Sequence, residues 1–158
     1  MIFFFLFFSL IAGAVGAVAM NLSMRAMSRL GGGDEVDMIV ALGSYFTGKK
    51  EHAARVGFFI HLASGIFFGL VYGLLFSAIG LIDLPQIFLI GLGFGFIHGM
   101  GMAYFLMIYL AEKHPLQEYR EASLVIGGIH LAGHLVYGAV VGLVAGIGTL
   151  IGNAVGLS

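Results

Sequence analysis

Four of the six histidines lie in uncharged stretches of the sequence, where an ionisable side chain is a candidate for function. His130 and His134 stand one helical turn apart in IHLAGHLVYGAVVG, so both imidazoles face the same side of a helix. His61 occurs in IHLASG and His98 in GFIHGM. Neutral imidazole binds copper, zinc, iron and nickel ions, and it is also an axial ligand of haem iron. These histidines therefore predict a metal or haem site in apolar surroundings.

Haem b is the cofactor that we expect first. His61 and His130 could serve as two axial ligands, and the glycines on either side of His98 would leave room beside its ring. The predicted cofactor-binding residues are His61, His98, His130, His134, Gly95 and Gly99. The alternative is a transition-metal ion, copper, zinc or iron, bound or passed by His130, His134, His61 and His98. A proton pathway is a third hypothesis, because histidine titrates near neutral pH.

Other kinds of site are excluded by the residues that are missing. The chain has no cysteine, so it has no disulfide, thiolate zinc site, iron–sulfur cluster or cysteine nucleophile. No Asp or Glu lies in the uncharged stretches, which argues against a di-iron carboxylate site. Intramembrane histidines can also act only as hydrogen-bonding contacts between helices, and this purely structural interpretation stays open.

The composition fixes the environment of the histidines. Of the 158 residues 60% are hydrophobic and 9% are charged, and the mean hydropathy is +1.07, which predicts an integral membrane protein. Four uncharged stretches are long enough to cross a bilayer as helices. We expect these spans at about 2–24, 56–81, 86–110 and 122–151. The predicted fold is an all-α, four-helix membrane bundle in a single domain covering residues 1–158.

The seven basic residues predict the orientation. They all fall in the connections 25–55 and 111–121, and neither terminus carries one. The positive-inside rule then places both connections in the cytoplasm and both termini outside, in a bacterial inner membrane. Within the first connection we expect a short amphipathic helix at about 35–47 that begins at an Asp34 cap and lies on the inner membrane surface, with docking on a partner as the alternative.

An internal repeat relates the second and fourth spans. IHLASGIFFGLVYGLL at 60–75 aligns with IHLAGHLVYGAVVGLV at 129–144, so that His61 matches His130 whereas His134 matches a glycine, Gly65. Each half would be a helical hairpin, and both hairpins would have the same orientation, as in a parallel repeat.

Glycines at four-residue spacing accompany the histidines along each helix. The second span carries Gly65, Gly69 and Gly73 after His61, and comparable series occur in the third and fourth spans. Small residues at this spacing let helices pack closely in lipid. We therefore expect a glycine stripe at each helix interface and a histidine cluster facing the bundle interior.

Methionines and a polar connection are weaker candidates. Met20, Met24 and Met27 share a face of the first span, and Met100, Met102 and Met107 lie in the third. A copper route could use such thioethers, although packing is the commoner role of methionine. His114, Glu118 and Glu121 could form an ion site, and a solvated loop is the interpretation that we favour.

The pattern resembles small uncharacterised four-span bacterial inner-membrane proteins, through the first-span ending GAVAMNLSMRAM and the glycine-striped helix bearing IHLA. The resemblance implies a location and a fold, and no activity. We expect a small subunit or accessory of a larger membrane complex, or a self-associating protein, rather than a stand-alone enzyme. A purely structural scaffold subunit is the other alternative. No nucleic-acid partner is expected.

Overall fold

The computed structural model of the chain describes residues 2–30, 37–120 and 123–157. Every secondary-structure element in these ranges is a helix. The Met107 side chain, Asp34 and Glu121 lie outside the described residues. In chain order the helices are α1 (Ile2–Leu30), α2 (Met38–Thr47), α3 (Ala53–Ile79), α4 (Gln86–Phe105), the π-helical turn η1 (Leu106–Leu110), the 3-10 turn η2 (Gln117–Tyr119) and α5 (Leu124–Ala154).

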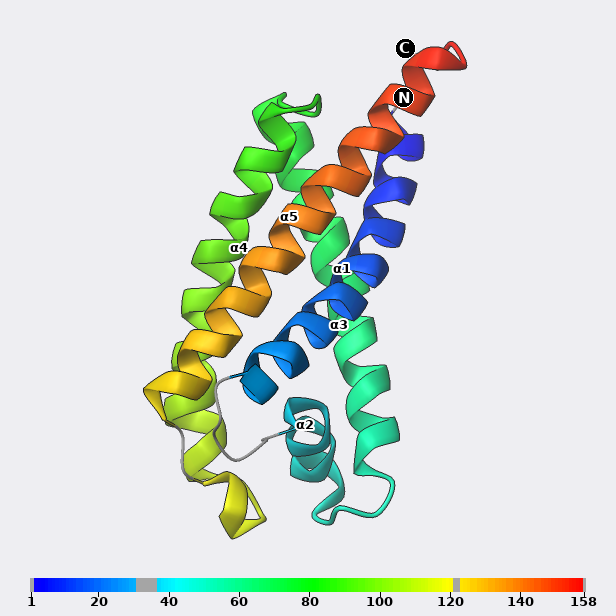
Figure 1. Cartoon of the computed structure of the whole chain (residues 1–158). Helices are drawn as coiled ribbons and strands as arrows, with labels where there is room; N and C mark the ends of the chain where they lie inside the picture. Colours follow the sequence, from blue (N-terminus) through cyan, green and yellow to red (C-terminus); the bar gives the residue numbers. More distant parts are fainter. Residues whose placement is uncertain (1, 31–36, 121–122, 158) are drawn as a thin grey trace.

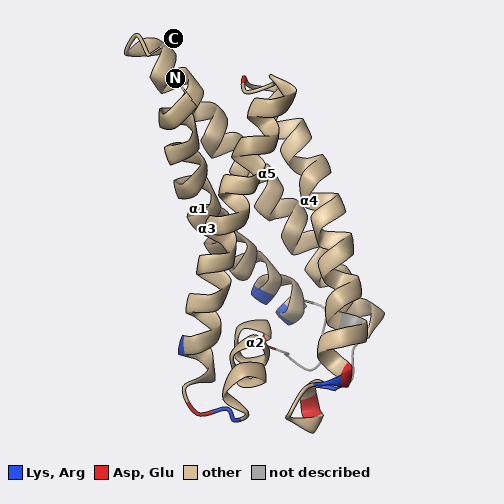
Figure 2. Ribbon diagram, turned by 180° about the vertical axis from the view of Figure 1, so that it is seen from behind, with Lys and Arg blue, Asp and Glu red and all other residues tan. Residues whose placement is uncertain are grey.

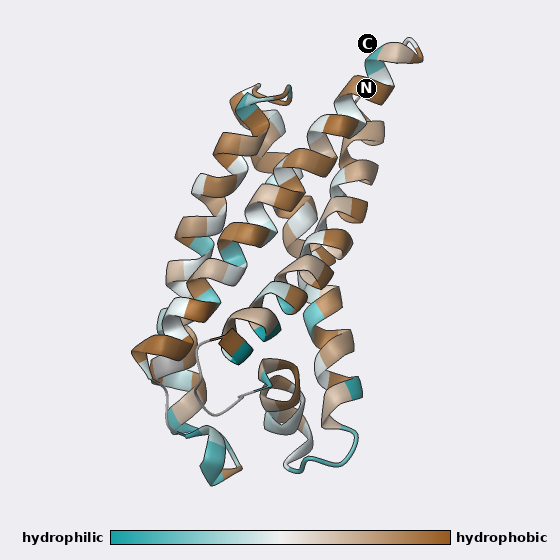
Figure 3. Ribbon diagram, viewed as in Figure 1, coloured by the Kyte–Doolittle hydropathy of each residue, from teal (hydrophilic) through white to brown (hydrophobic). Residues whose placement is uncertain are grey.

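Four of these helices are long and apolar enough to cross a membrane: α1, α3, α4 extended by η1, and α5. The shortest of them has 25 residues, which corresponds to about 37 Å of helix and exceeds the roughly 30 Å hydrocarbon core. Hydrophobic residues run along all four, and Figure 3 shows the hydrophilic ones gathered mainly in the connections and around α2. The described part of the chain is accordingly helical, with four helices that could span a membrane. Lys and Arg lie only toward the α2 end of the bundle (Figure 2).

The long helices are arranged so that α1 and α5 occupy the middle of the bundle (Figure 1). The α3 helix packs along α1, α4 packs along α5, and α1 packs along α5, whereas α3 and α4 touch each other at few points. Aromatic rings bridge part of the space between these outer helices: Phe76 stacks on Phe94, with ring centroids 5.4 Å apart. Unequal packing therefore leaves the α3–α4 side less closely filled than the α1–α5 side.

Glycines bring the helix backbones together within each hairpin. A Cβ on Gly69 of α3 would lie against the Cα of Gly13 on α1, and a Cβ on Gly138 of α5 would lie against the carbonyl of Gly91 on α4. A side chain at any of these positions would displace a backbone atom, and a backbone cannot move away as cheaply as a flexible side chain. The crossings α1–α3 and α4–α5 thus depend on residues without a Cβ.

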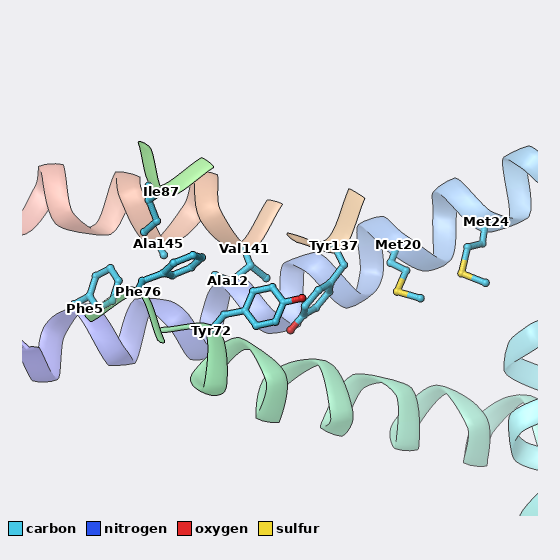
Figure 4. Packing of buried hydrophobic residues seen from close by; sticks show 10 residues of the cluster. All are labelled: Phe5, Ala12, Met20, Met24, Tyr72, Phe76, Ile87, Tyr137, Val141 and Ala145. Carbon is cyan, nitrogen blue, oxygen red and sulfur yellow. The ribbon is translucent and has the colours of Figure 1, made fainter. Parts of the chain in front are cut away.

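The large side chains of the core lie between α1, α3 and α5, as Figure 4 shows. The cluster contains Phe5, Ala12, Met20, Met24, Tyr72, Phe76, Ile87, Tyr137, Val141 and Ala145. Its aromatic members reach from Phe5, near the start of α1, to Tyr72 and Tyr137, and the two methionines extend the cluster along α1 toward the α2 end. The core therefore changes from aromatic to thioether packing as it approaches α2.

The short helix α2 differs from its expected form. Its N-cap is Asp37, whose side chain accepts hydrogen bonds from the backbone amides of Ile39 and Val40, rather than Asp34. The α2 helix packs against α3, where Gly43 and Gly57 let the two backbones cross. The Arg25 guanidinium of α1 also reaches the Asp37 carboxylate, at 3.0 Å. The α2 helix consequently covers one end of the bundle.

Candidate functional site: a cavity lined by histidine and methionine

A cavity of about 160 Å³ lies in the half of the bundle nearest α2. Residues from all five α-helices line it, and none of the lining residues is Asp, Glu, Lys or Arg. The lining includes every predicted histidine, namely His61, His98, His130 and His134. Its other chemically distinctive members are the methionines Met20, Met24, Met38 and Met102. The cavity therefore offers imidazole nitrogens and thioether sulfurs with no charged side chain beside them.

His134 occupies the centre of the histidine set. Its ring lies 4.7 Å from the ring of His98 on α4, centroid to centroid, at a nearly perpendicular angle of 72°. The ring of His130, one turn earlier on α5, is 6.3 Å away. His134 is 6% exposed, so most of its ring is covered by other residues. One imidazole thus has a second within ring contact and a third within reach.

The hydrogen bond of His134 fixes its tautomer. Its Nδ1 is 2.8 Å from the carbonyl oxygen of His130. A carbonyl oxygen only accepts, so Nδ1 must carry the proton and Nε2 of the neutral ring must carry the lone pair. Within the described residues no hydrogen bond occupies that Nε2. His134 therefore holds a lone pair ready for a ligand in a buried position.

His61 is oriented in the same manner from the opposite helix. Its Nε2 lies 3.3 Å from the carbonyl oxygen of Ala17 on α1 and must donate to it, which leaves the lone pair on Nδ1. In metal sites the ligating histidine commonly donates its second ring nitrogen to a backbone carbonyl, which orients the ring. His61 and His134 both show this arrangement.

His98 and His130 are held less completely. The Nδ1 of His98 lies 3.3 Å from the Tyr72 hydroxyl, and its ring packs on Phe68 at 4.1 Å between centroids. His130 is 6% exposed, and its Nδ1 is buried without a partner in hydrogen-bond geometry, although the Ile126 carbonyl one turn earlier lies near it. A buried imidazole nitrogen without a good partner is energetically unfavourable and indicates a group that can gain from a ligand.

Gly95 and Gly99, predicted to leave room for a cofactor beside His98, pack against α5 instead. A Cβ on Gly95 would meet the carbonyl oxygen of His134, and a Cβ on Gly99 would lie 2.7 Å from the Cβ of His134. The space beside these glycines is therefore taken by α5 itself and not by a cofactor. Neither glycine lines the cavity. They act on the site indirectly, by letting His134 approach α4.

Two tyrosines belong to the site and were absent from the sequence-based set. The Tyr137 hydroxyl donates to the Gly65 carbonyl at 2.6 Å and so ties α5 to α3, and the Tyr72 ring packs on Tyr137 at 5.6 Å between centroids. A signal for both exists in the sequence, because the tetrapeptide LVYG occurs at 70–73 and again at 135–138. The two copies place one tyrosine on α3 and one on α5.

His114 lies apart from the cavity and is not in a solvated loop. It is 1% exposed, its Nε2 donates to the Ala41 carbonyl of α2 at 3.0 Å, and its Nδ1 accepts from the Leu116 amide at 3.1 Å. Nearby, a salt bridge of 2.7 Å joins Lys50 to Glu118, and its hydrogen bond raises the pKa of Lys50. These contacts attach the connection after η1 to α2.

A complete metal-ligand set is not preformed from histidine and carboxylate alone. In the part of the chain that the structure describes, no three His, Asp or Glu side chains are grouped closely enough to hold one ion. An ion in the cavity would therefore need imidazoles to turn toward it, or ligands of another kind.

Comparison with known proteins places the chain in a family without assigning it an activity. The model of DUF6789, a family of unknown function, matches residues 6–151, and the chain belongs to this family. No curated protein and no solved structure matches it. The match confirms the resemblance to an uncharacterised small protein that the sequence pattern indicated.

Proposed function

We propose that the protein binds a transition-metal ion in the cavity between its membrane helices, through the imidazoles of His61, His98, His130 and His134. One observation carries the proposal: four imidazoles from three helices line a single cavity without charged side chains, and two of them are already oriented by backbone carbonyls. A neutral imidazole lone pair is a donor that copper, zinc and iron ions take readily.

The spacing of the rings supports an ion. Two imidazoles that bind one ion at about 2.0–2.1 Å per nitrogen, at a tetrahedral angle, have centroids about 5 Å apart. The rings of His98 and His134 are 4.7 Å apart. In addition, His130 and His134 are an i, i+4 pair, the spacing with which a helix presents two imidazoles to one zinc ion in metalloproteases. Small ring movements would bring a shared ion within reach of three imidazoles.

Haem b, the cofactor first expected from the sequence, is supported less well. A cavity of about 150 Å³ accommodates a molecule the size of benzene, and pockets for larger ligands span about 300–1,000 Å³. The cavity here has a volume of about 160 Å³. Haem binding would require α3 and α4 to move apart, whereas a single ion needs no such change.

The location and setting of this function are part of the proposal. The positive-inside rule places the α2 end, with the basic residues, in the cytoplasm of a bacterium and both termini outside.

We also propose that the hairpins α1–α3 and α4–α5 are parallel repeats. The aligned glycines Gly69 and Gly138 each pack against a glycine of the partner helix, Gly13 and Gly91, which supports this view. A role as a subunit of a larger membrane complex stays a prediction, and co-purification at fixed stoichiometry tests it.

The experiment is metal analysis of the full-length protein purified in detergent. Metal-free protein is dialysed against limiting Cu(I), Zn(II), Co(II) or Fe(II), and bound metal is quantified by elemental analysis beside an absorption spectrum. We expect one ion per chain, and the double variant His61→Gln, His134→Gln should bind it at least about tenfold more weakly, the lower end of the loss seen when a supporting partner is removed.

The matched control is His52→Asn. His52 is exposed at the start of α3, outside the cavity, and has a positive φ of 61°, a conformation that asparagine tolerates. This variant should bind the ion like the parent. A Soret band without bound metal ion would support haem instead, and the absence of both metal and Soret band from folded protein would refute the proposal.

A further inference from the structure

The methionines of the cavity are placed where their sulfurs can act together with the histidines. Met20 and Met24 are 4% and 5% exposed, and Figure 4 shows that they project from α1 to the same side. Met38 of α2 and Met102 of α4 line the cavity from two further helices. Four methionines and four histidines therefore line the same cavity.

Met24 packs on α5 beside the helical turn that carries the histidines. A Cβ on Gly133 would lie 2.6 Å from Cγ and 2.8 Å from the sulfur of Met24. Gly133 precedes His134 directly and follows His130 by less than one helical turn. The thioether of Met24 thus rests on α5 in the turn between His130 and His134, in space that exists because residue 133 has no side chain.

The charge of the cavity lining discriminates between ions. Imidazole and thioether are neutral ligands, and no charged side chain lines the cavity, so a bound ion keeps its whole charge. The Born penalty for moving an ion into a medium of low dielectric rises with the square of its charge. A monovalent ion therefore meets about a quarter of the penalty that a divalent ion of the same size meets. A neutral cavity in a membrane favours a single positive charge.

The softness of the ligands leads to the same choice. Thioether sulfur is a soft donor that selects Cu(I), whereas zinc, iron and manganese sites of proteins usually include thiolate or carboxylate ligands. In the described residues no three histidines or carboxylates are close enough to bind one ion. A Cu(I) site does not need three of them, since a methionine sulfur supplies a further ligand.

We infer that the ion is Cu(I), held by His134 and its neighbouring imidazoles, His98 and His130, together with the thioether of Met24, and with Met20 as the neighbouring sulfur toward the middle of the bundle. This inference rests on the proposed function and names its substrate ion. It assigns a binding role to methionines that would otherwise only fill the core.

The test compares Cu(I) and Zn(II) binding by the full-length protein in detergent. Cu(I) is kept reduced with ascorbate and is competed against the chelator bathocuproine disulfonate, and Ag(I) serves as a redox-inert monovalent ion. The variant Met20→Leu, Met24→Leu keeps the side-chain volume and removes both sulfurs. We expect its Cu(I) and Ag(I) affinities to fall at least about tenfold, with Zn(II) binding changed less than about twofold.

Met100→Leu is the matched control, because Met100 is 52% exposed on α4 and does not line the cavity. It should bind Cu(I) like the parent, and X-ray absorption of the copper-loaded parent should show a sulfur scatterer that the double variant lacks. Circular dichroism and gel filtration confirm that each variant is folded.

The possible failures are distinguishable. If the parent binds Zn(II) or Co(II) through histidine but Cu(I) no more tightly, or if the double variant retains Cu(I) affinity and the sulfur signal is absent, the inference is wrong and the proposed function stands. If folded parent protein binds none of these ions, both the inference and the proposed function are wrong.

Discussion

A single methyl group at Gly91 should separate α4 from α5, whereas the same methyl group two residues later should not. A Cβ on Gly91 would press on the carbonyl oxygen of Gly138 and lie 3.2 Å from the Cα of Gly142, and all of these are backbone atoms. A Cβ on Gly93, on the same helix, would meet nothing within 4 Å. Gly91→Ala and Gly93→Ala are therefore matched in chemistry and helix, and they differ only in the space around the new methyl group.

The expected magnitude follows from this difference. Replacing glycine by alanine in a helix stabilises it by up to about 1 kcal/mol, and both variants share this term. Forcing an extra carbon into a close-packed site typically costs 1–3 kcal/mol, and only Gly91→Ala incurs it. We therefore expect the free energy of unfolding of Gly91→Ala to be about 1–3 kcal/mol lower than that of Gly93→Ala.

Reversible unfolding in mixed detergent–SDS micelles, followed by circular dichroism, measures this difference. Because His98 and His134 face each other across the same helix pair, Gly91→Ala should also weaken metal binding while Gly93→Ala leaves it unchanged. A stability difference below about 0.5 kcal/mol would mean that α4 and α5 do not cross at these glycines, and the packing argument would be refuted.

Three further predictions concern the contact between α5 and α3, the connection after η1, and the orientation of the chain. Tyr137→Phe removes the hydrogen bond to the Gly65 carbonyl and should destabilise the protein by only about 0.6 kcal/mol in the same unfolding assay, because that carbonyl keeps its helical partner. His114→Ala removes the buried contact with the Ala41 carbonyl and should speed tryptic cleavage in the connection after η1, with no change if this connection is already loose. The chain has no cysteine, so Lys49→Cys and Asp83→Cys in spheroplasts report the orientation: an impermeant maleimide should label only the second, and labelling of the first would reverse the predicted topology.

The main features of the fold could be predicted from hydropathy, because a membrane-spanning helix must satisfy its backbone hydrogen bonds within the segment. The position of α2 could not be predicted in this way. Its amphipathic pattern, with Asp37 at the cap, fits a membrane surface as well as a protein surface. The decisive contact is a backbone crossing at Gly43 and Gly57, and glycine leaves no hydrophobic signal.

The histidines of the site could be selected from the sequence because an imidazole in an uncharged helix is conspicuous, and the structure brings all four to one cavity. The roles of Gly95 and Gly99 could not be assigned, since the same spacing describes a glycine that makes room for a ligand and one that makes room for a helix. Tyr137 was missed because its partner is a backbone carbonyl, that of Gly65, and such contacts depend on helix rotation.

The packing also explains why only the second hairpin has a histidine at the position of His134. Its counterpart in the first hairpin is Gly65, where a Cβ would lie 2.5 Å from the Cβ of Ala17 on α1, so a ring cannot enter. In the second hairpin the facing residue on α4 is Gly99, and the missing side chain there leaves room for the histidine. The asymmetry between the two halves is thus set by one residue on each facing helix, and it places the central imidazole of the cavity on α5.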